Sequence, residues 1–104
     1  MSETITFATC KDRRQAAAIA RALVKEKLAA CVNLVPGVAS IYVWKGKLEE
    51  GREVLLLIKS RASLSKRLAA RVRQLHSYSV PEVVTVRIAS GDPDYLRWLR
   101  RSTR

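Results

Sequence analysis

The stretch Glu53–Ser60, with the sequence E-V-L-L-L-I-K-S, decides the fold class of this chain. Its centre, Val54–Ile58, has five apolar residues in succession. A strand with one face in solvent alternates apolar and polar residues, whereas an unbroken apolar run indicates a strand that is covered on both faces. Helices of the same chain are expected to cover one face. Because 104 residues form one small domain, a second subunit is predicted to cover the other face.

The segment before this stretch opens with a predicted strand and a predicted helix. Thr4–Phe7 is a short extended run that ends near Cys10. Apolar residues then recur at helical spacing, so residues 13–27 are predicted to form an amphipathic helix with an alanine-rich buried face. Asp12 is the expected N-cap, and Gln15, three residues later, completes a capping box.

Extended structure is predicted between this helix and the apolar stretch. Leu28–Val35 begins a strand, and Pro36-Gly37 indicates a turn or a bulge within it. The chain is expected to continue extended over Val38–Lys45, where β-branched and aromatic residues suit a pleated surface. Glu49-Glu50-Gly51 is predicted to form the short hairpin turn that leads into the apolar strand.

The segment after the apolar stretch predicts a helix, a strand and a final helix. Ser63 is expected to cap a helix over residues 63–75, with one apolar face and one basic face. Glu82–Ile88 is predicted to be a strand. The last helix is expected to begin with Asp92 as its N-cap and Pro93 as its first residue.

The predicted order is therefore βαββαβ followed by a terminal helix. This order is typical of the ferredoxin-like α+β arrangement, in which a four-stranded antiparallel sheet carries two helices on one face. Each helix in this arrangement links two strands that run parallel to each other, and it does so through a right-handed crossover. The other face of the sheet stays open, in agreement with the apolar third strand, and assembly through that face is expected.

Composition and charge limit the classes of protein that remain. The chain carries 20 Lys and Arg against 9 Asp and Glu, a net charge of +11 that favours polyanionic partners. Two cysteines without a CxxC pair do not indicate a disulfide framework. The length predicts a single domain over residues 1–104. No secretory signal and no membrane-spanning run are recognisable, so we expect no membrane partner and a reducing cytoplasm.

Five strings, in order and at matching spacing, resemble the CutA (divalent-cation tolerance) family: L-A-A-C-V-N at 28–33, P-G-V-A-S-I-Y-V-W-K-G-K-L-E-E at 36–50, E-V-L-L-L-I-K-S at 53–60, H-S-Y-S-V-P-E at 76–82 and G-D-P-D-Y-L-R-W-L at 91–99. The resemblance implies a homotrimer of ferredoxin-like subunits arranged like the PII-type proteins. It also implies a role in tolerance to divalent cations, copper above all, with no established reaction.

This chain departs from the family pattern in one connector. Family members usually carry His-Pro-Tyr-Glu where this chain has His76-Ser77-Tyr78-Ser79. The absent proline loosens the connector. Ser79 removes a carboxylate that could hold a metal or pair with a lysine. The very basic composition is the second departure.

The predicted metal ligands are His76, Cys31 and Glu82. Imidazole and thiolate are ligands that copper prefers, and His76 is the only histidine of the chain. One chain has too few soft ligands for a closed site, so a specific copper site is expected to be shared between subunits. Copper or another divalent cation is thus an expected ligand, not a required cofactor. The alternatives stay open: His76 as a hydrogen-bonding residue and Cys31 as a small buried residue.

Cys10 lies at the end of the first strand, before a helix N-terminus, where the helix dipole could lower a thiol pKa. A buried structural cysteine is the preferred interpretation.

A ligand cleft between subunits is also predicted, lined by Trp44, Lys59 and Tyr78 together with His76 and Glu82. Lys59 would meet an anion, and the aromatic rings would stack on the ligand. The alternative is that these aromatic residues belong to the core or to an interface.

The leading functional hypothesis is a trimeric binding or regulatory protein for divalent cations, with a small ligand in the cleft. The chain between the middle strands is too short for a PII-type signalling loop. The alternative is nucleic-acid binding through the basic faces of the two long helices, which would depend steeply on salt. An acylphosphatase-like enzyme is disfavoured, because C-K-D-R-R at 10–14 is not a glycine-rich phosphate loop.

Overall fold

The computed structural model describes residues 2–104, and Met1, the first residue of the predicted domain, lies outside the described residues. The strands form one antiparallel sheet in the order β2-β3-β1-β4. This arrangement confirms the ferredoxin-like α+β prediction. The elements are β1 (Glu3–Cys10), α1 (Arg13–Lys25), β2 (Cys31–Trp44), β3 (Lys47–Arg61), a 3-10 turn (Ala62–Leu64), α2 (Ser65–Leu75), β4 (Val83–Arg87) and α3 (Pro93–Arg101).

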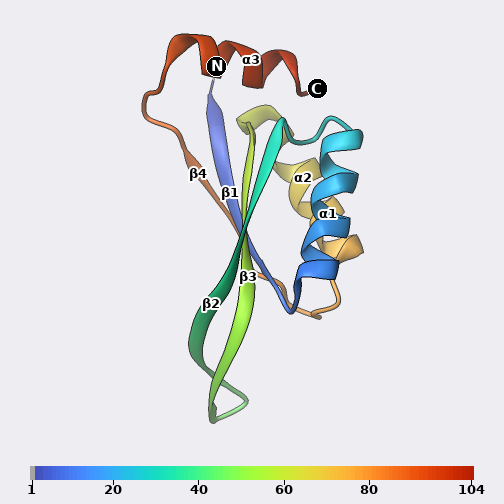
Figure 1. The fold of residues 1–104 in the computed structure, drawn as a ribbon, viewed down its shortest axis with the longest axis vertical. Helices are drawn as coiled ribbons and strands as arrows, with labels where there is room; N and C mark the ends of the chain where they lie inside the picture. The colour runs from blue at the N-terminus through green and yellow to red at the C-terminus, as the bar shows by residue number, and fades with distance from the viewer. Residues whose placement is uncertain (1) are drawn as a thin grey trace.

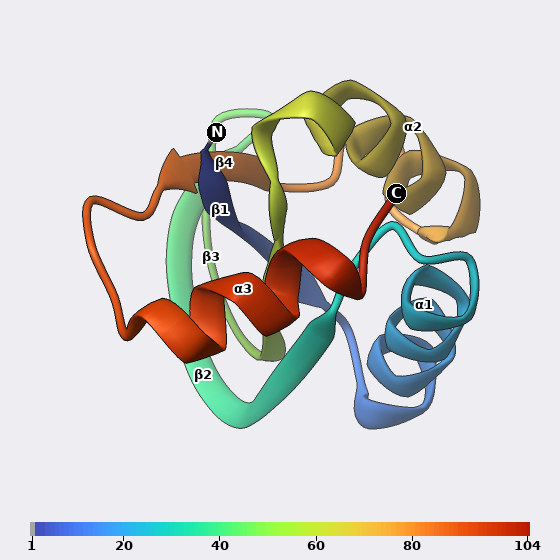
Figure 2. The same cartoon turned by 90° about the horizontal axis from the view of Figure 1, so that it is seen from above.

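The helices are distributed unevenly over the sheet (Figure 1). Helices α1 and α2 lie side by side and cover one face, while α3 crosses the end of the sheet at which β1 begins (Figure 2). An ion pair between Arg100 and Glu3, 2.8 Å long, joins α3 to β1. Over the other face of the sheet, the described part of the chain places no helix. Within residues 2–104, no helix is both long enough and apolar enough to cross a membrane.

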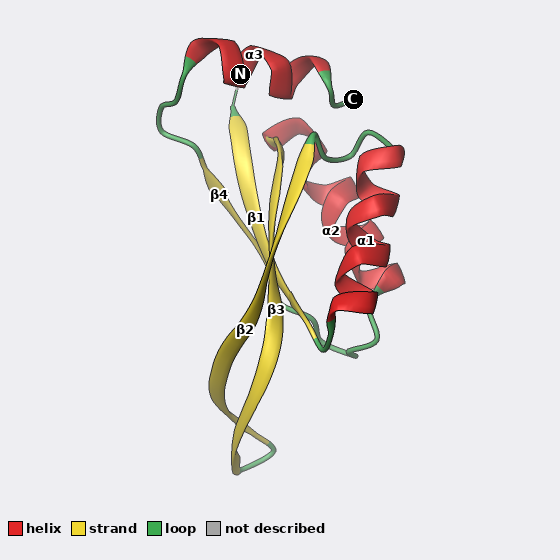
Figure 3. Ribbon diagram, in the orientation of Figure 1, coloured by secondary structure: helices red, strands yellow, loops and turns green. Residues whose placement is uncertain are grey.

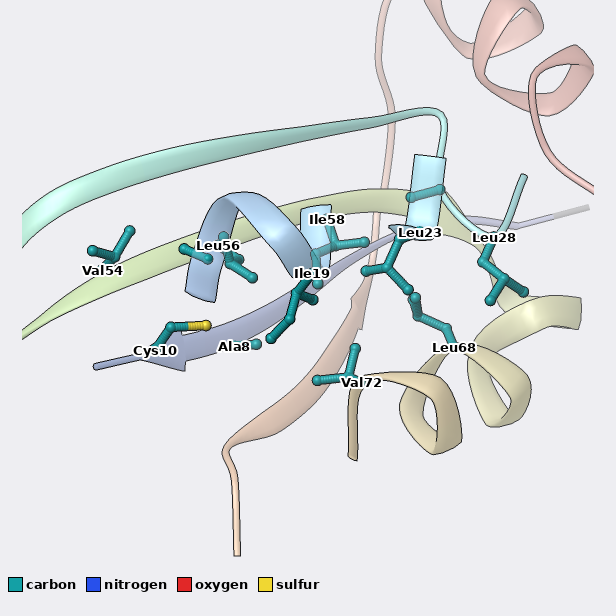
Figure 4. Close-up of a cluster of buried hydrophobic side chains, with 12 residues drawn as sticks. Ala8, Cys10, Ile19, Leu23, Leu28, Val54, Leu56, Ile58, Leu68 and Val72 are labelled. Carbon is teal, nitrogen blue, oxygen red and sulfur yellow. The ribbon is translucent and has the colours of Figure 1, made fainter. Parts of the chain in front are cut away.

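The core lies between the sheet and the helices α1 and α2 (Figure 4). Val54, Leu56 and Ile58 of β3 are buried toward this core, whereas Leu55 and Leu57, on the opposite face, are only half-buried. The apolar strand is therefore covered on one face by its own chain. Cover of the other face by a second subunit, which the sequence pattern indicates, stays a prediction.

The hairpin that joins β2 and β3 differs from the prediction. The turn is Lys45-Gly46, and Glu49-Glu50-Gly51 lies within β3, where it pairs with Ser40, Ile41 and Tyr42 of β2. Both turn residues have positive φ, 52° and 79°, as a two-residue turn of the type I′ kind requires. A lysine in this conformation gives no sequence signal, which is why the prediction was wrong by several residues.

The hairpin projects well beyond the helices (Figure 3). The register between β2 and β3 is interrupted between Val35 and Val38, which confirms the irregularity predicted at Pro36-Gly37. Gly37 takes a φ of 74° at this point. Beyond it, residues 38–53 form a two-stranded arm whose apolar side chains, Ile41, Val43 and Leu48 among them, are largely exposed.

The helix caps were predicted with mixed success. The Asp12 carboxylate accepts the Gln15 N–H at 2.9 Å, and the Asp92 carboxylate accepts the Tyr95 N–H at 3.0 Å, so both N-caps are confirmed. Ser63 is not a cap, because it lies inside the 3-10 turn that precedes α2. The N-cap position of α2 is Leu64, which makes no side-chain capping hydrogen bond.

Candidate functional site

A cavity of about 470 Å³ lies on the open side of the sheet, where the projecting arm leaves the core. Alternate residues of a strand point to the same face, so Ser40, Tyr42 and Trp44 of β2 are directed together. Glu53 of β3 and Thr9 of β1 lie beside them, and the connector before β4 closes one side. The lining residues are Thr9, Ser40, Tyr42, Trp44, Glu53, Tyr78, Ser79, Val80 and Glu82.

Tyr78 connects the connector to the sheet. Its phenol donates a hydrogen bond to the Glu53 carboxylate, with 2.8 Å between the oxygens. Burial of the ring, followed by this hydrogen bond, raises the pKa of Tyr78 far above its usual value. The phenol therefore stays protonated and fixes one oxygen of Glu53.

His76 is buried directly behind the cavity. Its Nε2 lies 2.7 Å from the carbonyl oxygen of Thr9, and its Nδ1 accepts the backbone N–H of Tyr78 at 3.1 Å. A carbonyl oxygen only accepts, so the hydrogen of the neutral ring is on Nε2. The ring also packs on Tyr78, with 4.6 Å between their centroids. Both nitrogens are thus engaged, and a metal would have to displace one of these hydrogen bonds.

The structure brings together some of the predicted site residues and separates others. Trp44, Tyr78 and Glu82 line the cavity, as expected for the cleft. Lys59 does not line it, since its ammonium donates to the Asn33 side chain elsewhere on the sheet. Cys31 is paired with Lys59 across β2 and β3, away from the cavity.

The three predicted metal ligands are therefore not gathered within one chain. Among the residues that the structure describes, no three His, Cys, Asp or Glu side chains lie close enough to hold a metal ion. A site shared between subunits, as the sequence analysis expects, stays a prediction.

The two cysteines have different environments. Cys10 is fully buried, and burial, followed by the nearby charges of Glu53 and Asp12, raises its thiol pKa from 9.0 to about 11. Burial thus outweighs any lowering of the thiol pKa at the helix N-terminus, which supports the structural interpretation of Cys10. Cys31 is a free thiol at the start of β2 and is half-buried, less enclosed than a core cysteine.

Sequence reasoning missed six of the nine cavity residues: Thr9, Ser40, Tyr42, Glu53, Ser79 and Val80. The alternation of Ser40, Tyr42 and Trp44 was a usable signal for three side chains on one face. Glu53 could be placed beside them only with the correct hairpin register. Because the turn was predicted at Glu49–Gly51, that register was lost.

These features define the class of the protein: an α+β chain of ferredoxin-like topology, with an acidic, aromatic-lined cavity where its hairpin arm leaves the sheet. Comparison with known proteins identifies the family. Residues 4–102 match the family model described as "CutA1 divalent ion tolerance protein", and the chain belongs to that family.

Relatives with assigned names support this membership. The "Divalent-cation tolerance protein CutA" of Thermus thermophilus is 48% identical over 101 residues, which are 97% of this chain and 98% of that protein. "Protein CutA" of Mus musculus is 47% identical over 102 residues. The chain spans 98% of its own length in that match but only 58% of the mouse protein. Of these two names, that of the Thermus thermophilus protein refers to tolerance of divalent cations.

Solved structures agree with the fold. The Thermus thermophilus Cut A1 structure superposes with a TM-score of 0.95 at 47% identity, covering 98% of this chain and 99% of that one. The CutA structure of Xylella fastidiosa gives a TM-score of 0.97 at 39% identity and covers all of both chains. CutA1 of Oryza sativa gives 0.97 at 41% identity, covering 100% of this chain and 95% of that one.

Proposed function

We propose that this chain acts as a non-catalytic homotrimeric binding protein in divalent-cation tolerance, and that it takes up a cation in the cavity beside the hairpin arm. One observation carries the proposal. Two carboxylates, Glu53 and Glu82, line the cavity and no Lys or Arg of residues 2–104 does, although the chain as a whole has a net charge of +11. A cavity with this lining favours cations in a protein that otherwise attracts anions.

The open face of the sheet supports assembly. Ile5 and Phe7 of β1, Leu55 and Leu57 of β3, and Val84 and Val86 of β4 alternate with core residues and so lie on this face. Val84 and Val86 are 52% and 43% exposed. Contiguous apolar surface of this kind commonly marks a protein interface. The three-fold state follows from the family resemblance, and the cavity borders the same face.

Copper is the divalent cation that we propose first, because the family resemblance indicates it. His76 offers no free nitrogen in the isolated chain, so any copper ligation must involve Glu82 or Cys31 across a subunit boundary, or a rearrangement at His76.

Cys10 and Cys31 are both free thiols, which supports a reducing cytoplasm as the proposed location. One related structure, from Archaeoglobus fulgidus, is named as a periplasmic protein.

Native mass spectrometry during a copper titration tests this function. We expect a trimer that takes up copper to a saturating ratio, and a lower uptake when Glu82→Gln or Cys31→Ser is introduced. Glu50→Gln is the matched control, because Glu50 lies on the arm outside the cavity lining. Gradual uptake without saturation, unchanged in both variants, would remove specific copper binding. A monomer at micromolar concentration would remove the assembly.

A further inference from the structure

We propose that the cavity is built to hold an organic cation, an alkylguanidinium or alkylammonium group, which competes with divalent cations for Glu53 and Glu82. This inference rests on the proposed function, in which the cavity binds a cation, and it adds a second chemical class of cation that the same cavity would hold. The reasons are the donor set, the aromatic walls, the fixed position of one carboxylate and the size of the cavity.

Within one chain, the donor set is incomplete for a bare metal ion. Soft metals prefer thiolate and imidazole, but neither cysteine lines the cavity and both nitrogens of His76 are engaged in hydrogen bonds. Tyr78 points its hydroxyl at Glu53 as a donor. The lining side chains therefore offer a metal two carboxylates and neutral hydroxyls. A hard cation such as Ca²⁺ takes six to eight oxygen ligands, several of them charged or carbonyl oxygens.

The aromatic walls fit an organic cation well. Tyr42, Trp44 and Tyr78 present three rings to one cavity. A ring face attracts an ammonium or guanidinium group that can shed its water, and tryptophan attracts it most. The alkyl part of such a ligand packs on the same rings. A hydrated metal ion gains little from aromatic walls, so their presence distinguishes the two kinds of ligand.

Glu53 and Glu82 complete the recognition of a positive charge. Tyr78 holds Glu53 through one oxygen, which leaves the other oxygen lone pairs for a donor from the ligand. Glu82 is exposed and forms no salt bridge among the residues that the structure describes. A guanidinium or ammonium group carries several N–H donors and can reach both carboxylates. The volume of about 470 Å³ lies in the range of small-molecule sites.

The test uses the full chain in its native assembly and three probes of similar size: butylguanidinium, butylammonium and the neutral butylurea. Binding is followed by isothermal titration calorimetry and by the fluorescence of Trp44 in a Trp98→Phe background. We expect saturable binding of the two cations and no binding of butylurea. Glu82→Gln should weaken binding about tenfold or more and Trp44→Leu several-fold, whereas Glu50→Gln should change it less than twofold. Copper should compete with butylguanidinium.

Each other outcome has a clear meaning. Equal binding of butylurea would show that charge is not recognised and would overturn the inference. Saturable copper uptake without binding of either organic cation would overturn the inference and leave the proposed function intact. If no cation of any kind binds, both fail. If neither probe binds and Glu82→Gln dissociates the trimer, the cavity holds a basic side chain of a neighbouring copy, which also overturns the inference.

Discussion

At the scale of single residues, His76 and Cys10 are structural residues placed directly beside the candidate site. His76 joins the end of β1 to the connector through hydrogen bonds to Thr9 and Tyr78, and Tyr78 in turn fixes Glu53. The only histidine of the chain thus holds the wall of the cavity and does not present a free nitrogen to it. Cys10 packs in the core, where its side chain is fully buried.

The role of His76 predicts a graded response to substitution. His76→Ala leaves the Thr9 carbonyl and the Tyr78 N–H without partners, and we expect a loss of about 1–3 kcal/mol in the free energy of unfolding. His76→Gln keeps an N–H donor near the position of Nε2 and should lose less. Urea denaturation followed by circular dichroism measures both. An alanine variant as stable as the unmodified chain would contradict the hydrogen bonds described here.

Cys10 predicts a loss of stability at alkaline pH. Its thiol pKa is about 11 in the folded chain and 9.0 ordinarily, so the unfolded chain loses this proton first as the pH rises. The contribution is fully present below pH 9 and falls between about pH 9 and pH 11, by at most about 1.4 kcal/mol for each pH unit. Cys10→Ala should flatten this fall in urea midpoints measured at pH 8 and pH 10.5. Cys31→Ala is the control and should leave the fall unchanged.

At the scale of elements, the β2–β3 hairpin has the largest effect on the site, because its register decides which side chains meet. The two-residue turn Lys45-Gly46 sets Tyr42 opposite Glu49 and Val38 opposite Glu53. With this register, Tyr42, Trp44 and Glu53 all reach one cavity. A turn three or four residues later would direct a different set of side chains toward the connector.

The turn predicts a stabilising substitution. Lys45 has a φ of 52°, a conformation that costs most L-residues about 1–2 kcal/mol but that asparagine adopts more readily. We therefore expect Lys45→Asn, which creates an Asn-Gly turn, to raise the free energy of unfolding by about 0.5 kcal/mol. Thermal unfolding at fixed protein concentration measures the change. Lys47→Asn, the same substitution in extended backbone, is the control, and an equal gain there would contradict the role of the turn conformation.

At the scale of the whole molecule, the two faces of the sheet have different roles. The face with α1 and α2 forms the core, and its outer surface is basic, with Arg13, Arg21, Lys66 and Arg67 exposed. The opposite face is apolar and leads directly into the cavity. Assembly through this face, as we propose, would place the cavities near the subunit boundaries and leave the basic helices outside.

A pair of matched substitutions tests this division. Leu57→Glu places a charge at the centre of the open face, and we expect it to convert the trimer into monomers, because burying an unpaired carboxylate is unfavourable. Val24→Glu places the same charge on the outer side of α1, where Val24 is 42% exposed, and should leave assembly unchanged. Size-exclusion chromatography with light scattering distinguishes the two. A trimeric Leu57→Glu variant would show that assembly uses another surface.

The sequence by itself determined the order of the elements, the inner faces of the helices, two of the helix caps and the family. All of these depend on residues within a few positions of one another or on short strings of residues, so local periodicity and capping chemistry were sufficient. Only the tertiary structure decided which side chains line the cavity. Its contacts join Thr9 to His76 and Glu53 to Tyr78, 67 and 25 positions apart, and depend on a turn in which a lysine takes positive φ. No local pattern encodes such pairings, because the register of the hairpin and the packing of the connector against β1 arise only when the chain is folded.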